Sequence, residues 1–141
     1  MRQLVLLAAL ASLLLVGCSS GNLSNLDGTN WTFFGYDIGG GVVDVIPSTE
    51  PTIAFEGDTV SGSDGCNDFT GSYEISPGNM IEIGPLASTL KACEADVMAQ
   101  ADVILNIVSN AFLYEKTSDG QLIMRTQEAR FAGYNEFQPP S

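Results

Sequence analysis

The side chains that carry out most enzyme chemistry are sparse in this sequence. It contains no histidine, the commonest general base and zinc ligand, so a serine or cysteine nucleophile has no histidine partner. Its 17 acidic residues are scattered over predicted turns and strand ends, which favours solvated surface carboxylates over a glycosidase-like acid pair. No Gly-x-Ser-x-Gly elbow, phosphate-binding loop or Cys-x-x-Cys pair occurs. The sequence therefore predicts a protein without catalytic residues and without a cofactor.

One loop has the composition of a metal site. Asp58 and the stretch 64–68 (DGCND) are rich in oxygen ligands, as calcium-binding loops are. The stretch lacks the glycine and the terminal glutamate at the spacing that a calcium-binding hand requires. We interpret it instead as a turn in which Asn and Asp side chains bond to their own backbone, and we predict no metal.

The N-terminus predicts export and lipidation. Arg2 is followed by an apolar run from Leu4 to Val16, which is too short to span a membrane and is typical of a secretory signal peptide. The run ends in LVGC, which resembles the bacterial lipobox, whose cysteine receives a diacylglycerol before cleavage. We therefore expect residues 1–17 to be a signal peptide and Cys18 to be lipidated. Residues 18–25 would be a polar tether, and the protein would be held at a membrane. In a Gram-negative cell, the absence of Asp at position 19 resembles the signal for the outer membrane, facing the periplasm.

Cys66 and Cys93 are the cysteines that remain. In an oxidising compartment they can form a disulfide, which would close a loop of about 28 residues. They can equally be two buried thiols that behave as small apolar side chains. Both alternatives are open at this stage.

The charge of the chain limits its partners. Loss of Arg2 with the signal peptide leaves four of the five basic residues against 17 acidic ones, so the net charge changes from −12 to −13. Such a surface repels nucleic acid and anionic lipid headgroups, and we expect neither as a partner.

The rest of the chain predicts one domain of class α+β, mainly antiparallel β, with a curled sheet or small barrel and one principal helix packed across it. Short apolar or alternating runs are separated by regular turn signals, and we expect a loose tail over residues 136–141. The helix is expected from Glu94 to Asn110, with one apolar face made by Val97, Ala101, Ile104, Leu105 and Val108. The expected strands are 29–36, 42–46, 52–55, 59–61, 70–75, 80–83, 112–116, 122–126 and 130–134.

Glycines and aromatic residues gather where the chain is expected to turn sharply. Three glycines lie within ten residues around Cys66, which predicts a tight corner with close backbone packing. Trp31, on the first expected strand, would be buried either in a filled core or in the wall of an apolar cavity.

This corner carries a resemblance to a known family. Residues 55–73 (FEGDTVSGSDGCNDFTGSY) and 88–93 (STLKAC) resemble the META domain, found in heat-shock lipoproteins, and the likeness extends from Leu26 to about residue 135. The motif residues are Gly65, Cys66, Asn67, Phe69, Gly71, Tyr73, Thr89 and Cys93. The family commonly has a methionine shortly before the second cysteine, where this chain has Leu90-Lys91-Ala92.

The resemblance implies a compact antiparallel barrel with one helix, in envelope proteins linked to stress. It supplies no active site, so we expect a non-catalytic binding or chaperone-like module. Its candidate partners are other envelope proteins or an apolar peptide or lipid held in a cavity between helix and sheet. The alternative is a structural envelope component that acts through surface protein contacts and has no ligand cavity.

Overall fold

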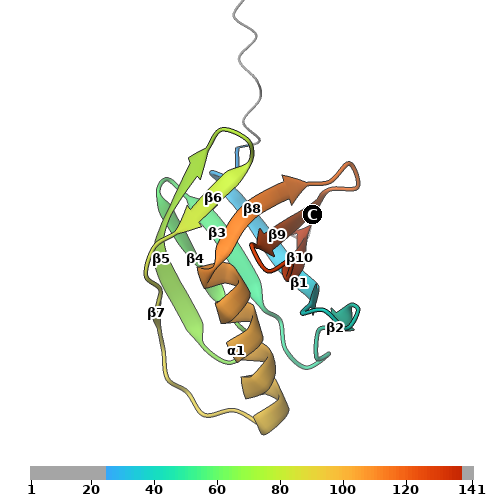
Figure 1. The fold of residues 1–141 in the computed structure, drawn as a ribbon. Helices are drawn as coiled ribbons and strands as arrows, with labels where there is room; N and C mark the ends of the chain where they lie inside the picture. The colour runs from blue at the N-terminus through green and yellow to red at the C-terminus, as the bar shows by residue number, and fades with distance from the viewer. Residues whose placement is uncertain (1–24, 138–141) are drawn as a thin grey trace, which may run out of the picture.

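A computed structural model describes residues 25–137, which form ten β-strands and one α-helix (Figure 1). The predicted signal peptide, the predicted lipidation site Cys18, almost all of the predicted tether and most of the predicted tail lie outside these residues. The elements in chain order are β1 (Thr29–Asp37), β2 (Val43–Asp44), β3 (Thr52–Glu56), β4 (Thr59–Ser63), β5 (Asp68–Ser76), β6 (Met80–Ile83), β7 (Ala87–Ser88), α1 (Ala95–Ser109), β8 (Ala111–Lys116), β9 (Gln121–Thr126) and β10 (Phe131–Glu136).

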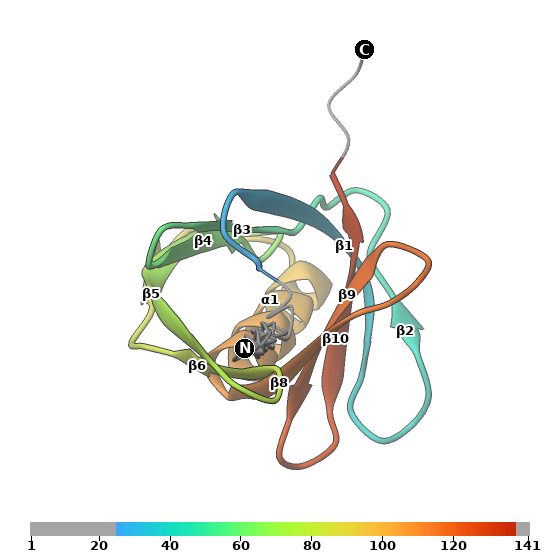
Figure 2. The same ribbon diagram turned by 90° about the horizontal axis from the view of Figure 1, so that it is seen from above.

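Eight of these strands close into an antiparallel barrel. The hydrogen-bonded order is β10-β9-β8-β6-β5-β4-β3-β1, and pairing of β1 with β10 completes the ring (Figure 2). The short strands β2 and β7 lie outside the ring, on β1 and β5 respectively. The shortest strand pairing in the ring is between β6 and β8, where Met80 opposite Leu113 is the one register pair. The predicted fold class, a mainly antiparallel barrel with one helix, is confirmed.

The barrel strands form where they were predicted because their apolar side chains alternate with polar ones. In β3, Ile53 and Phe55 are buried while Thr52 and Glu56 on either side of them are exposed. Tight turns join successive strands. Between β3 and β4 the turn contains Gly57, whose φ of +62° is one that glycine adopts without steric cost.

Two short strands differ from the prediction. The strand expected over residues 42–46 is reduced to β2, because the backbone N–H of Ile46 donates to the side chain of Gln100 on α1 at 2.8 Å. Strand β7 was not predicted. It pairs two residues with β5 directly after a glycine and a proline, and it is too short to show an alternating pattern.

Helix α1 packs against the barrel, as predicted, and Figure 2 shows it lying across the opening of the ring. Glu94 and Asn110 are its caps rather than its first and last helical residues. The buried stripe also differs from the prediction: Val97 and Leu105 are only half-buried, whereas Ile107 is fully buried. Truncating Leu105 to alanine should therefore destabilise the fold by less than the roughly 2–5 kcal/mol typical of a fully buried leucine. The buried helix residues are Gln100, Ala101, Ile104, Ile107 and Val108.

Large side chains fill the interior of the barrel. Trp31, Phe55, Tyr114, Tyr134 and Met124 are each 0–2% exposed. A side chain that lined a void large enough for water would show accessible surface, so there is no room for a ligand beside these residues. The apolar cavity that was one of the two readings of Trp31 is therefore a packed core.

Candidate functional site

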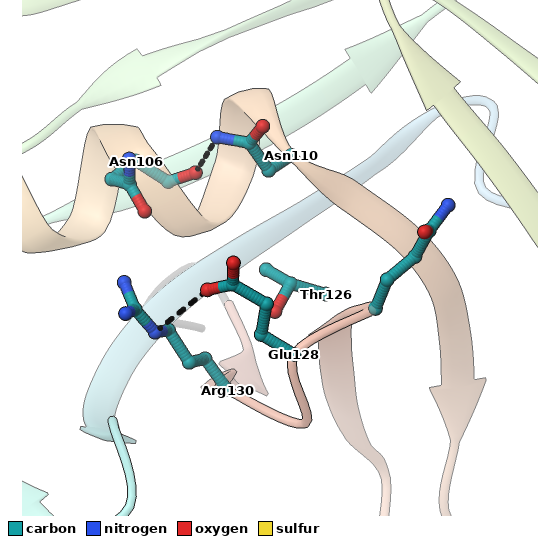
Figure 3. Close-up of a pocket in the computed structure, with 6 residues that line it drawn as sticks. Asn106, Asn110, Thr126, Glu128 and Arg130 are labelled. Atoms are coloured by element: carbon teal, nitrogen blue, oxygen red, sulfur yellow. Dashed lines mark hydrogen bonds and ion pairs between the residues drawn. The ribbon is translucent and has the colours of Figure 1, made fainter.

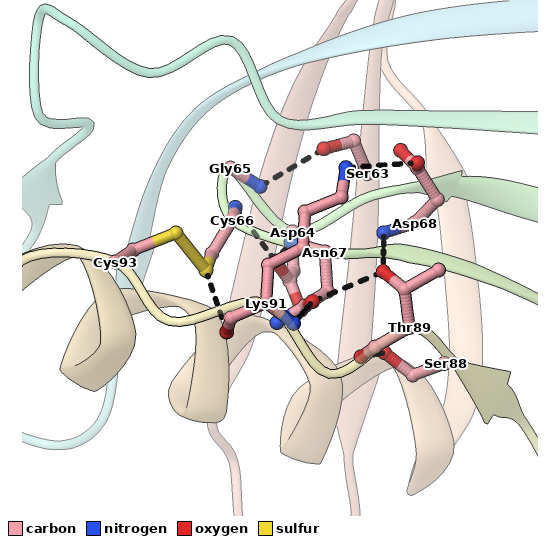
Figure 4. Close-up of polar contacts among 10 residues, drawn as sticks. All are labelled: Ser63, Asp64, Gly65, Cys66, Asn67, Asp68, Ser88, Thr89, Lys91 and Cys93. Carbon is pink, nitrogen blue, oxygen red and sulfur yellow. Dashed lines mark hydrogen bonds and ion pairs between the residues drawn. A yellow bond between two sulfur atoms is a disulfide. The ribbon is translucent and has the colours of Figure 1, made fainter.

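The Asp64–Asn67 loop between β4 and β5 is folded by its own side chains (Figure 4). Asp64 is 1% exposed, and its Oδ1 atom accepts the backbone N–H groups of Cys66 at 2.8 Å and Asn67 at 2.6 Å. Its own N–H donates to the carbonyl oxygen of Asn67 at 2.9 Å. This is the turn chemistry expected for the loop. Gly65, with φ of +95°, completes it, and a Cβ there would lie 3.1 Å from Thr49.

A disulfide joins this loop to the segment that leads into α1. Cys66 and Cys93 are bonded, with Cα atoms 6.0 Å apart. Of the two alternatives for these cysteines, the structure therefore contains the disulfide. The bond fixes the distance between the β4–β5 loop and the start of the helix, on a segment that β7 also attaches to the barrel.

Asn67 anchors the segment between β7 and the disulfide through hydrogen bonds to its side chain. Its Oδ1 atom accepts the N–H of Lys91 at 2.6 Å and the hydroxyl of Thr89 at 3.0 Å (Figure 4). Thr89 and Asp68 also exchange two bonds: the Thr89 N–H donates to the Asp68 carbonyl, and the Asp68 N–H donates to the Thr89 hydroxyl, both at 3.0 Å. Leu90 lies between these anchored residues, and its side chain is 97% exposed.

Gln100 connects α1 to the chain segment that follows β2, through hydrogen bonds to Ile46 and Thr49. Its side chain is 3% exposed, with Oε1 accepting the N–H of Ile46 and Nε2 donating to the Thr49 hydroxyl at 2.9 Å. The sequence motifs assign no role to this glutamine. Its place between Val97 and Ala101, on the apolar stripe, was the signal that it would be buried.

The remaining motif residues form the frame of this corner. Phe69 and Tyr73 are buried core residues of β5, and burial is the main reason that the pKa of the Tyr73 phenol lies above its ordinary value; Asp27 and Asp58 raise it further. Gly71 permits close approach of the chain, because a Cβ there would lie 2.9 Å from the carbonyl oxygen of Pro85.

An open groove lies between α1 and the segment that Asn67 and the disulfide hold. Its volume is about 440 Å³. We call it the Leu90 groove. Its walls are mainly apolar, and its lining also includes the exposed Asp102 and the buried Asp64. The apolar lining residues are Leu90, Ala92, Met98, Ala101 and Leu105.

A second, polar cleft lies at the other end of α1 (Figure 3), with a volume of about 530 Å³. Among its lining residues, the exposed side chains of Arg130 and Glu128 form an ion pair at 3.3 Å. The Asn110 amide donates to the carbonyl oxygen of Asn106 at 2.8 Å, which closes the helix end. Its lining therefore offers amides and one paired carboxylate, and no nucleophile with a base beside it.

Two further observations concern residues 25–137 only. Their cysteine, aspartate and glutamate side chains do not gather in threes at any point where they could hold a metal ion. Helix α1 is also shorter and less apolar than a membrane-crossing helix has to be.

Residues 24–135 match the META domain family. The chain belongs to this family. Its fold is similar to that of a protein from Burkholderia xenovorans determined by NMR, which is 20% identical with a TM-score of 0.68 over 81% of this chain and 85% of that one. It is also similar to the crystal structure of a DUF4847 family protein from Bacteroides vulgatus, 12% identical, with a TM-score of 0.56 over 83% of this chain and 98% of that one. No curated protein matches the sequence significantly.

The META motif and the Leu90 groove are parts of one structure. Gly65, Cys66, Asn67, Thr89 and Cys93 belong to the network that anchors the segment carrying Leu90. These residues are recognisable in the sequence through the family motif, whereas nothing in the local pattern of Leu90, Met98 or Asp102 distinguishes a groove from a core or a solvated face.

Proposed function

We propose that this META domain protein is an exported, lipid-anchored, non-catalytic module that binds other envelope proteins through its surface. The observation that carries this proposal is Leu90. Leu90 is 97% exposed on a segment held by a disulfide and several hydrogen bonds, and it lines a mainly apolar groove together with the exposed Met98; exposed apolar residues gathered in one place mark interaction sites.

Surface contact is favoured over ligand capture inside the barrel because the interior is packed. Side chains such as Trp31 and Phe55 leave no accessible space beside them, so an apolar peptide or lipid would have to displace the core. The reading with a ligand cavity is therefore replaced by its alternative, an envelope component that acts through surface protein contacts.

The way the chain enters the barrel fits attachment to a membrane. Gly28 donates its N–H to the carbonyl oxygen of Phe55 at 2.8 Å, and Asp27 accepts the N–H of Gly57 at 2.6 Å, so the chain enters beside the β3–β4 turn. The β3–β4 turn and the β4–β5 loop lie at opposite ends of β4 (Figure 1), and the Leu90 groove is lined by Asp64 of that loop, roughly 20 Å from the turn at the rise of an extended strand. A lipid on Cys18 would hold the groove away from the membrane, where a partner could reach it.

Charge and side-chain chemistry favour a protein partner over the other classes. The 17 acidic residues against four basic ones disfavour nucleic acid and anionic headgroups. The absence of histidine and the paired carboxylate of the polar cleft offer little for catalysis.

Replacing Cys18 by serine tests the anchoring part of the proposal. The wild-type protein should fractionate with membranes, with the mass expected for residues 18–141 plus acyl chains, whereas Cys18→Ser should keep its full length and stay unacylated. If Cys18→Ser fractionates with membranes at the processed mass, the lipid anchor is wrong.

Binding is tested with the lipidated protein on beads in envelope extracts, followed by mass spectrometry. A Thr117→Ser variant, altered at a half-buried turn residue that does not line the groove and whose hydroxyl serine retains, is the matched bait. Envelope proteins recovered equally by both baits, and absent from empty beads, support the proposal. If both baits recover only what empty beads recover, surface binding is contradicted.

A further inference from the structure

We infer that the Leu90 groove binds a segment of a partner protein in which an apolar side chain stands next to a lysine or arginine. This inference rests on the proposed surface-binding function and assigns a site and a partner chemistry to it. It is drawn from the apolar wall, the rigidity and the charge of the groove.

The apolar wall of the groove is ready to cover a side chain. Leu90 is 97% exposed and Met98 is 42% exposed, on opposite sides of the groove, with half-buried Leu105 also in its lining. A methionine thioether adapts its shape to different apolar partners. The volume of about 440 Å³ lies at the small end of binding pockets, which fits a few side chains of a segment rather than a folded surface.

The groove is formed before a partner arrives. One wall is fixed by the Cys66–Cys93 disulfide and by the bonds that Asn67 makes on both sides of Leu90. The other wall is α1, which the buried bonds of Gln100 fasten to the barrel. Binding therefore costs little ordering of this chain, and the burial of Leu90 can contribute fully to affinity.

The negative charge at the groove is the reason to expect a basic residue in the partner segment. Asp64 and Asp102 are both among the lining residues: Asp102 is exposed, and Asp64 is buried, with an Oδ2 atom that accepts no hydrogen bond from residues 25–137. The only basic side chain in the lining, Lys91, already lies 3.5 Å from Asp68. The field at the groove is therefore negative, which attracts a lysine or arginine beside the apolar side chain.

The same argument disfavours a second copy of this chain. With 17 acidic residues against four basic ones, two copies repel each other, and neither supplies a basic segment to fit the other's groove. A segment of a different protein that is both basic and apolar fits the apolar lining and the negative charge of the groove.

The test uses residues 18–141 with Cys18 replaced by serine, and three probe peptides of equal length. One alternates Leu with Lys, one Ser with Lys, and one Leu with Glu. Binding is measured by fluorescence anisotropy, and contacts are mapped from the chemical-shift changes of backbone amides. We expect saturable binding of the Leu/Lys peptide, with the largest shifts in residues 88–92 and on the exposed face of α1.

Substitutions of exposed side chains separate the apolar contribution to binding from the charge contribution, and they leave the fold intact. Leu90→Ser should weaken the Leu/Lys peptide by roughly ten- to a hundredfold, the range expected for burial of one leucine. Asp102→Asn should weaken it by about threefold and reduce its salt dependence. The matched control is Val42→Ser, which removes an apolar side chain that is 57% exposed elsewhere on the surface and should change nothing.

Several results would overturn the inference. Equal affinity for the Leu/Lys and Ser/Lys peptides would mean non-specific charge attraction, and preference for the Leu/Glu peptide would reverse the charge argument. Equal losses in Leu90→Ser and Val42→Ser would remove the groove as the site. These outcomes can be told apart from failure of the proposed function: envelope partners recovered by wild type and Leu90→Ser alike would support surface binding while contradicting this site.

Discussion

Reduction of the Cys66–Cys93 disulfide should destabilise the protein strongly, and it should do so through the unfolded chain. The two cysteines are 27 positions apart in the sequence. The bond therefore closes a large loop in the unfolded state, and breaking it restores conformational freedom to that state. Few native hydrogen bonds need to be lost, because Asn67 still holds the backbone on both sides of Leu90.

The size of the effect follows from the loop. The chain-entropy relation gives about 12 cal/mol/K for a loop of this length, which is about 3.6 kcal/mol at 25 °C. With a urea m-value of roughly 2 kcal/mol/M for a domain of this size, the unfolding midpoint should fall by about 1.8 M. The m-value should rise slightly, because the reduced unfolded chain is more expanded.

The measurement is urea unfolding of the Cys18→Ser protein, followed by Trp31 fluorescence with and without a reducing agent. Free thiols are counted in each sample to confirm the redox state. A fall in the midpoint of less than about 0.5 M would contradict the reasoning, since it would mean that the loop is restrained without the bond. A Cys66→Ser/Cys93→Ser double variant should match the reduced protein and be insensitive to the reducing agent.

Three further changes test the packing of the barrel. Tyr134→Phe should raise the free energy of unfolding by about 1 kcal/mol, because the buried Tyr134 hydroxyl has no hydrogen-bond partner among residues 25–137. Burial also raises the pKa of this phenol, so the folded protein favours its neutral form. The free energy of unfolding of the wild type should therefore fall as the pH rises above about 10, where the phenol of the unfolded chain ionises. In Tyr134→Phe this fall, followed by urea unfolding, should be less steep. Gly62→Ala would place a Cβ 2.0 Å from the carbonyl oxygen of Thr52 and should cost about 3 kcal/mol in urea unfolding, whereas Gly40→Ala meets nothing within 4 Å and should be neutral. Gln100→Ala should cost about 2–3 kcal/mol in thermal or urea unfolding because it leaves a backbone N–H and a hydroxyl without their partner; an unchanged midpoint would mean that water replaces it.

The architecture could be predicted from the sequence because its signals are local. Alternation in segments such as 52–55 and turn residues such as Gly57-Asp58 identify strands and hairpins without knowledge of their neighbours. The apolar period of α1 identified a helix that covers the barrel. The sequence left a curled sheet and a closed small barrel as alternatives, since the pairing of β1 with β10 across about 100 residues leaves no local pattern.

Features that depend on distant neighbours could not be predicted. Strand β2 ends early because Ile46 bonds to Gln100, which is 54 positions away. Leu105 and Ile107 are both apolar residues of the same helix, and the position of the barrel decides which of them is fully buried. Leu90 looks like a core residue in the sequence, and its exposure follows from the bonds on either side of it.

The segment just before the second cysteine lies at the groove. The resemblance described above implies a methionine there, and this chain has Leu90-Lys91-Ala92. All three of these residues line the groove, whereas Gly65, Cys66 and Cys93 form its frame. A methionine would keep an adaptable apolar wall, and leucine keeps an apolar wall of more fixed shape. The motif residues therefore form a rigid scaffold. The short segment that they hold in place is the part that would determine which partner is bound.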